Sequence, residues 1–202
     1  MAGDLDLADW RRRMGDVYRL PSHVEWRPAR DRLFRDHPQS PLPAAKRAAF
    51  SGLRWFPYDE AYRVGAVLDP GDGSRFEIDT GGEDGVVVYR RTGRLRFELA
   101  DEEMGLTVFR QLGYGGGLFV PFRDDTAGNE TYGAGRYLVD TVKNTDGHSL
   151  VIAPGSDRVT LDFNFAYNPS CVYDARWACP LAPIENRLSV PVRAGEMSWP
   201  ND

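Results

Sequence analysis

The stretch RLRFELA (residues 94–100) decides the fold class, because apolar and polar residues alternate along it. Leu95, Phe97 and Leu99 occupy every second position, and charged residues lie between them. Successive side chains of a β-strand point to opposite faces, so this pattern gives one apolar face and one polar face. The stretch therefore predicts a strand with one face against a core.

Further segments of strand length lie on both sides of this stretch, separated by turns rich in Gly, Asp and Asn. They are YRVGAVL (62–68), SRFEIDT (74–80), VVVYRR (86–91), LTVFRQL (106–112), LFVPF (118–122), GRYLVDTV (135–142), SLVIA (149–153), VTLDFNFAY (159–167) and RLSVPV (187–192). In LDFNFAY we expect Leu161, Phe163 and Phe165 to share one strand face. Short strands at near-regular spacing predict an antiparallel β-barrel or sandwich.

The first 60 residues carry a different pattern, with apolar residues three and four positions apart. Trp10, Met14 and Val17 predict one amphipathic helix. A second short helix begins near Pro21 and is interrupted at Pro28, and a third follows Pro43. The fold class is therefore mainly β, with short N-terminal helices packed on an antiparallel barrel or sandwich. We expect residues 1–202 to form a single domain, with a helical segment at 1–60 and the barrel with a long C-terminal loop at 61–202.

Charge and composition exclude several classes of function. The 202 residues carry a net charge of -5, which argues against nucleic-acid binding. No apolar run approaches the ~20 residues of a membrane helix, and the acidic N-terminus does not resemble a secretory signal. We therefore expect a cytoplasmic protein that binds no membrane, with its two cysteines as thiols.

Familiar catalytic and metal motifs are missing from the sequence. His23, His37 and His148 have no metal-ligand spacing, and Cys171 and Cys179 are too far apart for a usual zinc pair. We expect no metal, and no cofactor can be named. The run GYGGG (113–117) is followed by a strand and not by a helix, so it indicates a turn.

One dense polar segment spans residues 121–140. Its candidate ligand-binding residues are Arg123, Asp124, Thr126, Thr131, Tyr132 and Arg136. Arginine beside carboxylates and hydroxyls can bind an anionic or polar ligand. The alternative is a turn network in which Arg136 pairs with Asp124. In either case we predict that Arg136 is buried and bonded to a carboxylate, with Asp124 the favoured partner, because an unpaired buried charge is costly.

A second polar segment covers the end of the chain. Its candidates are Asp162, Asn164, Asn168, Cys171, Cys179 and Asn186. Irregular loops longer than ~12–15 residues are usually functional or disordered. The loop 168–186 is rich in proline and aromatic residues, so we predict that it packs across a barrel end, with Trp177 as an anchor. Both cysteines are either small buried apolar residues or a reactive pair.

Three long stretches resemble a bacterial and archaeal family of unknown function, DUF1684. They are SPLPAAKRAAFSGLRWFPYD, FRDDTAGNETYGAGRYL and LDFNFAYNPSCVYDARWACPLAPIENRLSVPVRAGE. The resemblance spans nearly the whole chain and implies a standalone domain of about this length, with no established activity. It points to recurring polar positions at Asp124, Thr126, Thr131, Tyr132, Arg136, Asn164, Asn168, Cys171, Cys179 and Asn186.

Three hypotheses for function follow. The first is a small-molecule-binding barrel protein with one polar pocket for an anionic or polar ligand. In this pocket Arg136 holds an anionic group, and Asp124 or Asp162 orients Arg136 or acts as a base. The second is a thiol-dependent redox protein that uses Cys171 and Cys179. The third is a non-enzymatic interaction module. A pocket that reaches Arg136 favours the first, and two sulfurs close together near a basic group favour the second.

Overall fold

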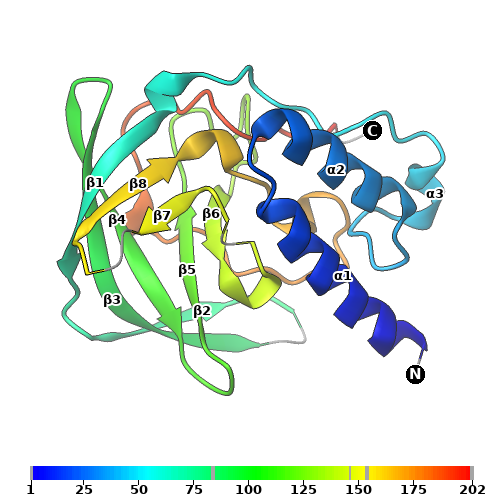
Figure 1. The fold of residues 1–202 in the computed structure, drawn as a ribbon. Helices are drawn as coiled ribbons and strands as arrows, with labels where there is room; N and C mark the ends of the chain where they lie inside the picture. The colour runs from blue at the N-terminus through cyan, green and yellow to red at the C-terminus, as the bar shows by residue number, and fades with distance from the viewer. Residues whose placement is uncertain (1, 83–84, 146, 153–154, 201–202) are drawn as a thin grey trace.

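The fold is a curled antiparallel sheet with helices packed on it (Figure 1). The computed structural model describes residues 2–82, 85–145, 147–152 and 155–200. Within these residues the sheet has eight strands. They are β1 (Arg63–Pro70), β2 (Arg75–Asp79), β3 (Val86–Leu99), β4 (Glu102–Gln111), β5 (Gly117–Phe122), β6 (Arg136–Asp140), β7 (Leu150–Ile152) and β8 (Arg158–Asp162).

The strand order is β6-β5-β4-β3-β1-β8-β7, with β2 paired to β3. Every pair is antiparallel, and the long β3–β4 hairpin places Leu95 opposite Leu106. Among the described residues no ladder joins β6 to β7, so the sheet is a half-barrel. Tyr137 of β6 and Tyr167, beyond β8, exchange backbone hydrogen bonds of 2.9 and 3.0 Å. This bridge connects the two sides of the curl.

Two apolar cores cover the two faces of the sheet. On the inner face, Leu95, Leu106 and Phe122 are fully buried together with Leu188 and Val192 of the C-terminal segment. On the other face, aromatic side chains of the sheet and of the helices form one core, in which Tyr167 stacks edge-on against both Tyr137 of β6 and Tyr18 of the first helix. The alternation in residues 94–99 is confirmed, because Leu95, Phe97 and Leu99 are buried and the charged residues between them are exposed.

The helices lie beside the sheet on its β6–β8 side (Figure 1). They are α1 (Ala2–Tyr18), α2 (His23–Asp36) and the single turn α3 (Ala44–Arg47). The prediction of short helices in the N-terminal segment is therefore confirmed, with only short 3-10 turns elsewhere in the described chain. The predicted interruption at Pro28 is wrong, because α2 continues through it. The buried stripe of Trp26, Arg30 and Phe34 holds the helix together on either side of the proline.

Two predicted strands are also corrected. In LDFNFAY, the strand ends at Asp162 and residues Phe163–Phe165 form a 3-10 turn, because the Asp162 carboxylate accepts the Asn164 backbone N–H at 3.0 Å. RLSVPV is not a strand of the sheet. It runs across the inner face and buries Leu188, Val190 and Val192 against it. SLVIA forms β7, although its last residue lies outside the described residues. None of the helices is long and apolar enough to cross a membrane, over the range that the structure describes.

Candidate functional site

The polar segment 121–140 forms a closed network around Arg136. This side chain is fully buried, and its guanidinium donates to the Asp124 carboxylate at 3.1 Å. The predicted pairing with Asp124 is therefore confirmed. The same guanidinium donates to the carbonyls of Val192 at 2.8 Å and Glu196 at 3.2 Å, and also to that of Ala194. The network thus holds the C-terminal segment against the sheet.

Asp124 completes this network from the opposite side. Its carboxylate accepts from the Thr126 hydroxyl at 2.6 Å and from the Val192 backbone N–H at 2.8 Å. The Thr126 and Thr131 hydroxyls lie 2.8 Å apart, and both side chains are buried. Arg123 is exposed, and its backbone pairs with the segment around Arg187. Arg136 lines none of the grooves and cavities described below.

Asp162, Asn164 and Asn186 bind backbone groups of distant segments. The Asn164 amide accepts from the Asp59 N–H at 3.0 Å and donates to the Asp59 carbonyl at 2.8 Å. Asp162 accepts from Asn164 and lies 3.8 Å from Arg63, so it does not orient Arg136. Asn186, fully buried, accepts from the Thr107 N–H at 2.7 Å and donates to the carbonyls of Thr107 and Pro121.

A buried charge cluster between α2 and the C-terminal segment was missed by the sequence analysis. Arg30 and Glu196 are 2% and 1% exposed and form an ion pair at 3.2 Å. Glu196 also accepts from the Asn168 backbone N–H at 3.1 Å and from the Tyr173 hydroxyl. A signal for Arg30 was present, because it lies four residues from both Trp26 and Phe34, on the apolar face of α2. Glu196 had no such signal.

A small cavity adjoins this cluster. It has a volume of about 30 Å³, and Arg30, Lys143, Asn168 and Ser170 supply its polar lining. The Asn168 side-chain oxygen is buried and has no hydrogen-bond partner within the described structure. A space of this size holds about two water molecules and excludes an organic ligand.

The two cysteines are brought together by the loop 168–186. Both are unbridged, with Cys179 buried and Cys171 partly exposed. Their thiols lie close enough to influence each other's ionisation, and the Tyr132 hydroxyl lies 3.9 Å from the Cys171 sulfur. Trp177 anchors this loop as predicted, by donating to the Pro41 carbonyl at 3.3 Å. We refer to Cys171 and Cys179 as the thiol pair.

The surroundings of the thiol pair favour one negative charge. The hydrogen bond from the Cys171 thiol lowers the pKa of Cys179 to about 6. The Lys143 cation and the backbone N–H groups of Ser170 and Cys171 act in the same direction, and burial opposes them. The same contact raises the pKa of Cys171. The pair therefore loses its first proton easily and retains its second, as expected for two coupled groups.

A groove of about 520 Å³ opens beside the thiol pair, and we call it the thiol-side groove. Ala178 and Pro180, the two chain neighbours of Cys179, form part of its wall. Lys143 and Asp140 lie in the same wall and form an ion pair at 3.2 Å. Apolar side chains of β3 supply much of the rest. This volume is within the range of small-molecule sites.

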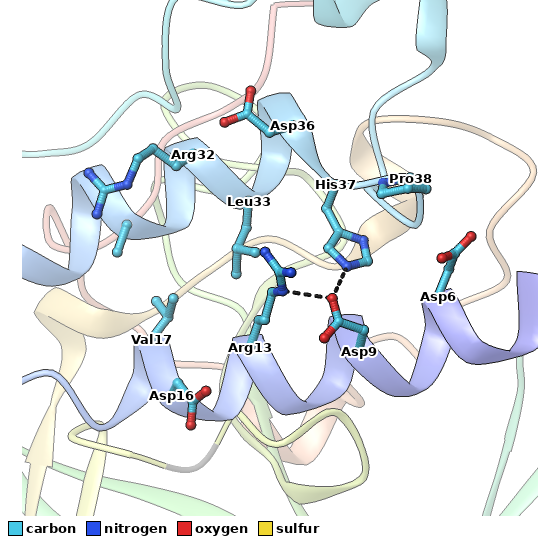
Figure 2. A pocket seen from close by; sticks show the side chains of 11 residues that line it. Asp6, Asp9, Arg13, Asp16, Val17, Arg32, Leu33, Asp36, His37 and Pro38 are labelled. Atoms are coloured by element: carbon cyan, nitrogen blue, oxygen red, sulfur yellow. Dashed lines mark hydrogen bonds and ion pairs between the residues drawn. The ribbon is translucent and has the colours of Figure 1, made fainter.

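Another groove, of about 670 Å³, lies between α1 and α2 (Figure 2). Three of its side chains, Asp9, Arg13 and His37, bond to one another. Asp9 accepts from Arg13 at 2.6 Å and from the His37 Nε2 at 3.2 Å (Figure 2). The other His37 nitrogen accepts the Gln39 backbone N–H at 3.1 Å, so neither ring nitrogen is open to a substrate. The described residues hold no group of three or more His, Cys, Asp or Glu side chains placed to bind a metal.

The fold makes this chain a β half-barrel protein with N-terminal helices on one face. In its site, buried polar networks position the loop that carries both cysteines. The chain belongs to the family described as protein of unknown function DUF1684, whose model matches residues 48–197. It is similar to an uncharacterised protein of Haloarcula marismortui, solved by solution NMR. The two share 38% identity over 85% of this chain and 89% of the other, with a TM-score of 0.62. No curated protein matches it.

Proposed function

We propose that this protein is a thiol-dependent redox protein that uses Cys171 and Cys179. The observation that supports this function best is the proximity of two unbridged thiols, with Lys143 in the same groove wall as the chain neighbours of Cys179. Thiolate is the reactive form of cysteine, and a nearby cation favours it. Two thiols in contact can also form a disulfide with each other, which a single cysteine cannot do.

The reaction that fits this pair is thiol–disulfide exchange with a disulfide of the form R–S–S–R. The proton shared between the sulfurs moves to Cys179, which leaves the charge on the more exposed Cys171. The Cys171 thiolate attacks one substrate sulfur, the S–S bond breaks, and RS⁻ leaves. That leaving group takes the proton of Cys179, whose sulfur then attacks Cys171 and releases the second RS⁻. The products are a protein disulfide, one RSH and one RS⁻.

Oxidised glutathione is the test substrate, and intact mass after alkylation is the readout. We expect the wild-type chain to lose both alkylation sites without retaining glutathione. Cys179→Ser should instead accumulate a mixed disulfide at Cys171, because the resolving sulfur is gone. If the wild-type chain and Cys179→Ser accumulate the same mixed disulfide at the same rate, the two sulfurs do not act together and the proposal fails.

The thiol-side groove supports a second candidate function, the binding of a small polar or anionic molecule. Lys143 and Arg11 supply positive charge there, and the apolar side chains of β3 supply contact area. A thermal-shift screen of small anionic metabolites tests it, since a ligand stabilises the folded state by mass action. We expect ligands whose effect is lost in Lys143→Met but kept in Lys46→Met, the other lysine of the chain. Equal shifts in both variants would contradict this site.

A further inference from the structure

Three arginines lie directly opposite one another on neighbouring strands. Arg75 of β2 faces Arg90 of β3, and Arg90 faces Arg110 of β4. We call these residues the arginine row. Like charges at directly opposed positions destabilise a sheet. The chain as a whole carries a net charge of -5, so an overall excess of basic residues does not explain the row.

The row is exposed and lacks counter-charges. No carboxylate lies within 4.0 Å of any of its three guanidinium groups, among the residues the structure describes. Other arginines of the same strand differ in this respect. Arg91 pairs with Glu185 at 2.6 Å, and Arg96 pairs with Asp69. The row therefore combines three cations that form no ion pair with any carboxylate of the described residues.

A groove of about 360 Å³ lies against two members of the row. Arg90, Arg110 and Gln111 form one wall, and the glycine-rich loop at 113–116 forms the other. A Cβ added at Gly116 would lie 3.8 Å from the Arg110 Nε, so this side chain lies beside the loop. The groove thus brings two guanidinium groups next to a stretch of backbone.

The glycine-rich loop adds backbone donors. Gly113, Gly115 and Gly116 have φ angles of +126, +88 and +59°, which other residues rarely adopt. Within the described part of the chain, the N–H groups of residues 113–116 donate to no backbone or side-chain acceptor. Backbone N–H groups in turns of this kind bind anions. The need to form a turn explains why glycines occupy these positions. It does not explain why N–H groups without a described acceptor lie beside two arginines.

The position of the row on the sheet also favours a binding site. Met104, Leu106 and Val108 occupy alternate positions of β4 and pack into the inner core. Arg110 is the next residue in this series. The row therefore begins where the apolar lining of the half-barrel ends.

We propose that the groove between Arg90, Arg110 and the loop 113–116 binds the phosphate group of a small phosphorylated molecule. Arginine matches phosphate through two parallel N–H bonds, and the negative charge of the ligand removes the repulsion along the row. Arg75 contributes at longer range through its charge. This site does not include the thiol pair, and its groove shares Gln111 and Leu112 with the thiol-side groove.

Pyrophosphate titration of the full chain tests the proposal, with backbone N–H shifts followed by NMR at constant ionic strength. We expect shifts concentrated at residues 113–117, Arg90 and Arg110. Arg90→Gln and Arg110→Gln should each weaken pyrophosphate binding by about tenfold or more, because each removes a charged hydrogen-bond donor. Arg158→Gln, an exposed strand arginine elsewhere on the sheet, is the matched control and should bind like the wild-type chain.

Two outcomes would overturn the site. One is a shift pattern in the wild-type chain that spreads over exposed arginines without preference for the loop. The other is an affinity of the Arg90→Gln and Arg110→Gln variants equal to that of Arg158→Gln. The backbone N–H shifts of the wild-type chain are measured without any variant. They therefore test the proposal even if a substitution impairs folding.

Discussion

Replacing Asp124 by Asn removes the carboxylate that forms an ion pair with the buried Arg136. The substitution keeps the shape of the side chain but leaves a cation that is 0% exposed without a counter-charge. Breaking a buried ion pair by neutralising one partner costs about 3–5 kcal/mol. Whole domains are stable by only about 5–15 kcal/mol. We therefore expect Asp124→Asn to lose about a fifth or more of the free energy of unfolding.

Urea unfolding followed by tryptophan fluorescence measures this loss from the shift in midpoint. Asp125→Asn is the matched control, because Asp125 is the exposed neighbour and lies 3.6 Å from Arg187. A surface pair of this kind contributes about 0–1 kcal/mol. A loss below about 1 kcal/mol in Asp124→Asn, indistinguishable from that of Asp125→Asn, would refute the assignment of Asp124 as the counter-charge of Arg136.

Three more predictions concern other parts of the molecule. The ultraviolet absorbance of the thiolate should appear with a midpoint near pH 6, where the pKa of Cys179 lies; the thiolate is present above that pH and lost below it. Lys143→Met should raise this midpoint and Lys46→Met should not, and an unshifted midpoint in Lys143→Met would exclude its cation as a cause. Asn186→Ala should cost about 3 kcal/mol or more, since it leaves three buried backbone groups unpaired; equal stability in urea would contradict this. Arg110→Gln should stabilise the chain by about 0.2–1 kcal/mol in phosphate-free buffer at low salt. If this gain in the free energy of unfolding does not shrink when salt is added, charge repulsion is not its cause.

Local patterns predicted much of the fold because burial in a sheet repeats every two residues. Leu95, Phe97 and Leu99 follow that rule, and so the β class and the antiparallel pairing could be predicted. The same rule gave a wrong result for residues 187–192. Their alternate apolar residues are buried, but the segment lies inside the half-barrel and bonds to Arg123 and Asp124, not to a neighbouring strand.

Contacts of the candidate sites could be predicted only where the residues lie close together in the sequence. The Arg136–Asp124 pair could be predicted, because the two residues are 12 positions apart and an arginine on a strand needs a carboxylate. The Arg30–Glu196 pair joins residues 166 positions apart, and no local pattern carries that information. Bringing the two cysteines into contact likewise depends on how the loop 168–186 packs.

The thiol pair is tested most directly by equilibrating the wild-type chain in mixtures of reduced and oxidised glutathione. The fraction of each alkylated species is then measured by intact mass. We predict a single two-electron transition in which both alkylation sites disappear together and no glutathione is retained. We also predict that Cys171→Ser loses this transition. Independent addition of glutathione to each cysteine, with no protein disulfide at any ratio, would contradict it.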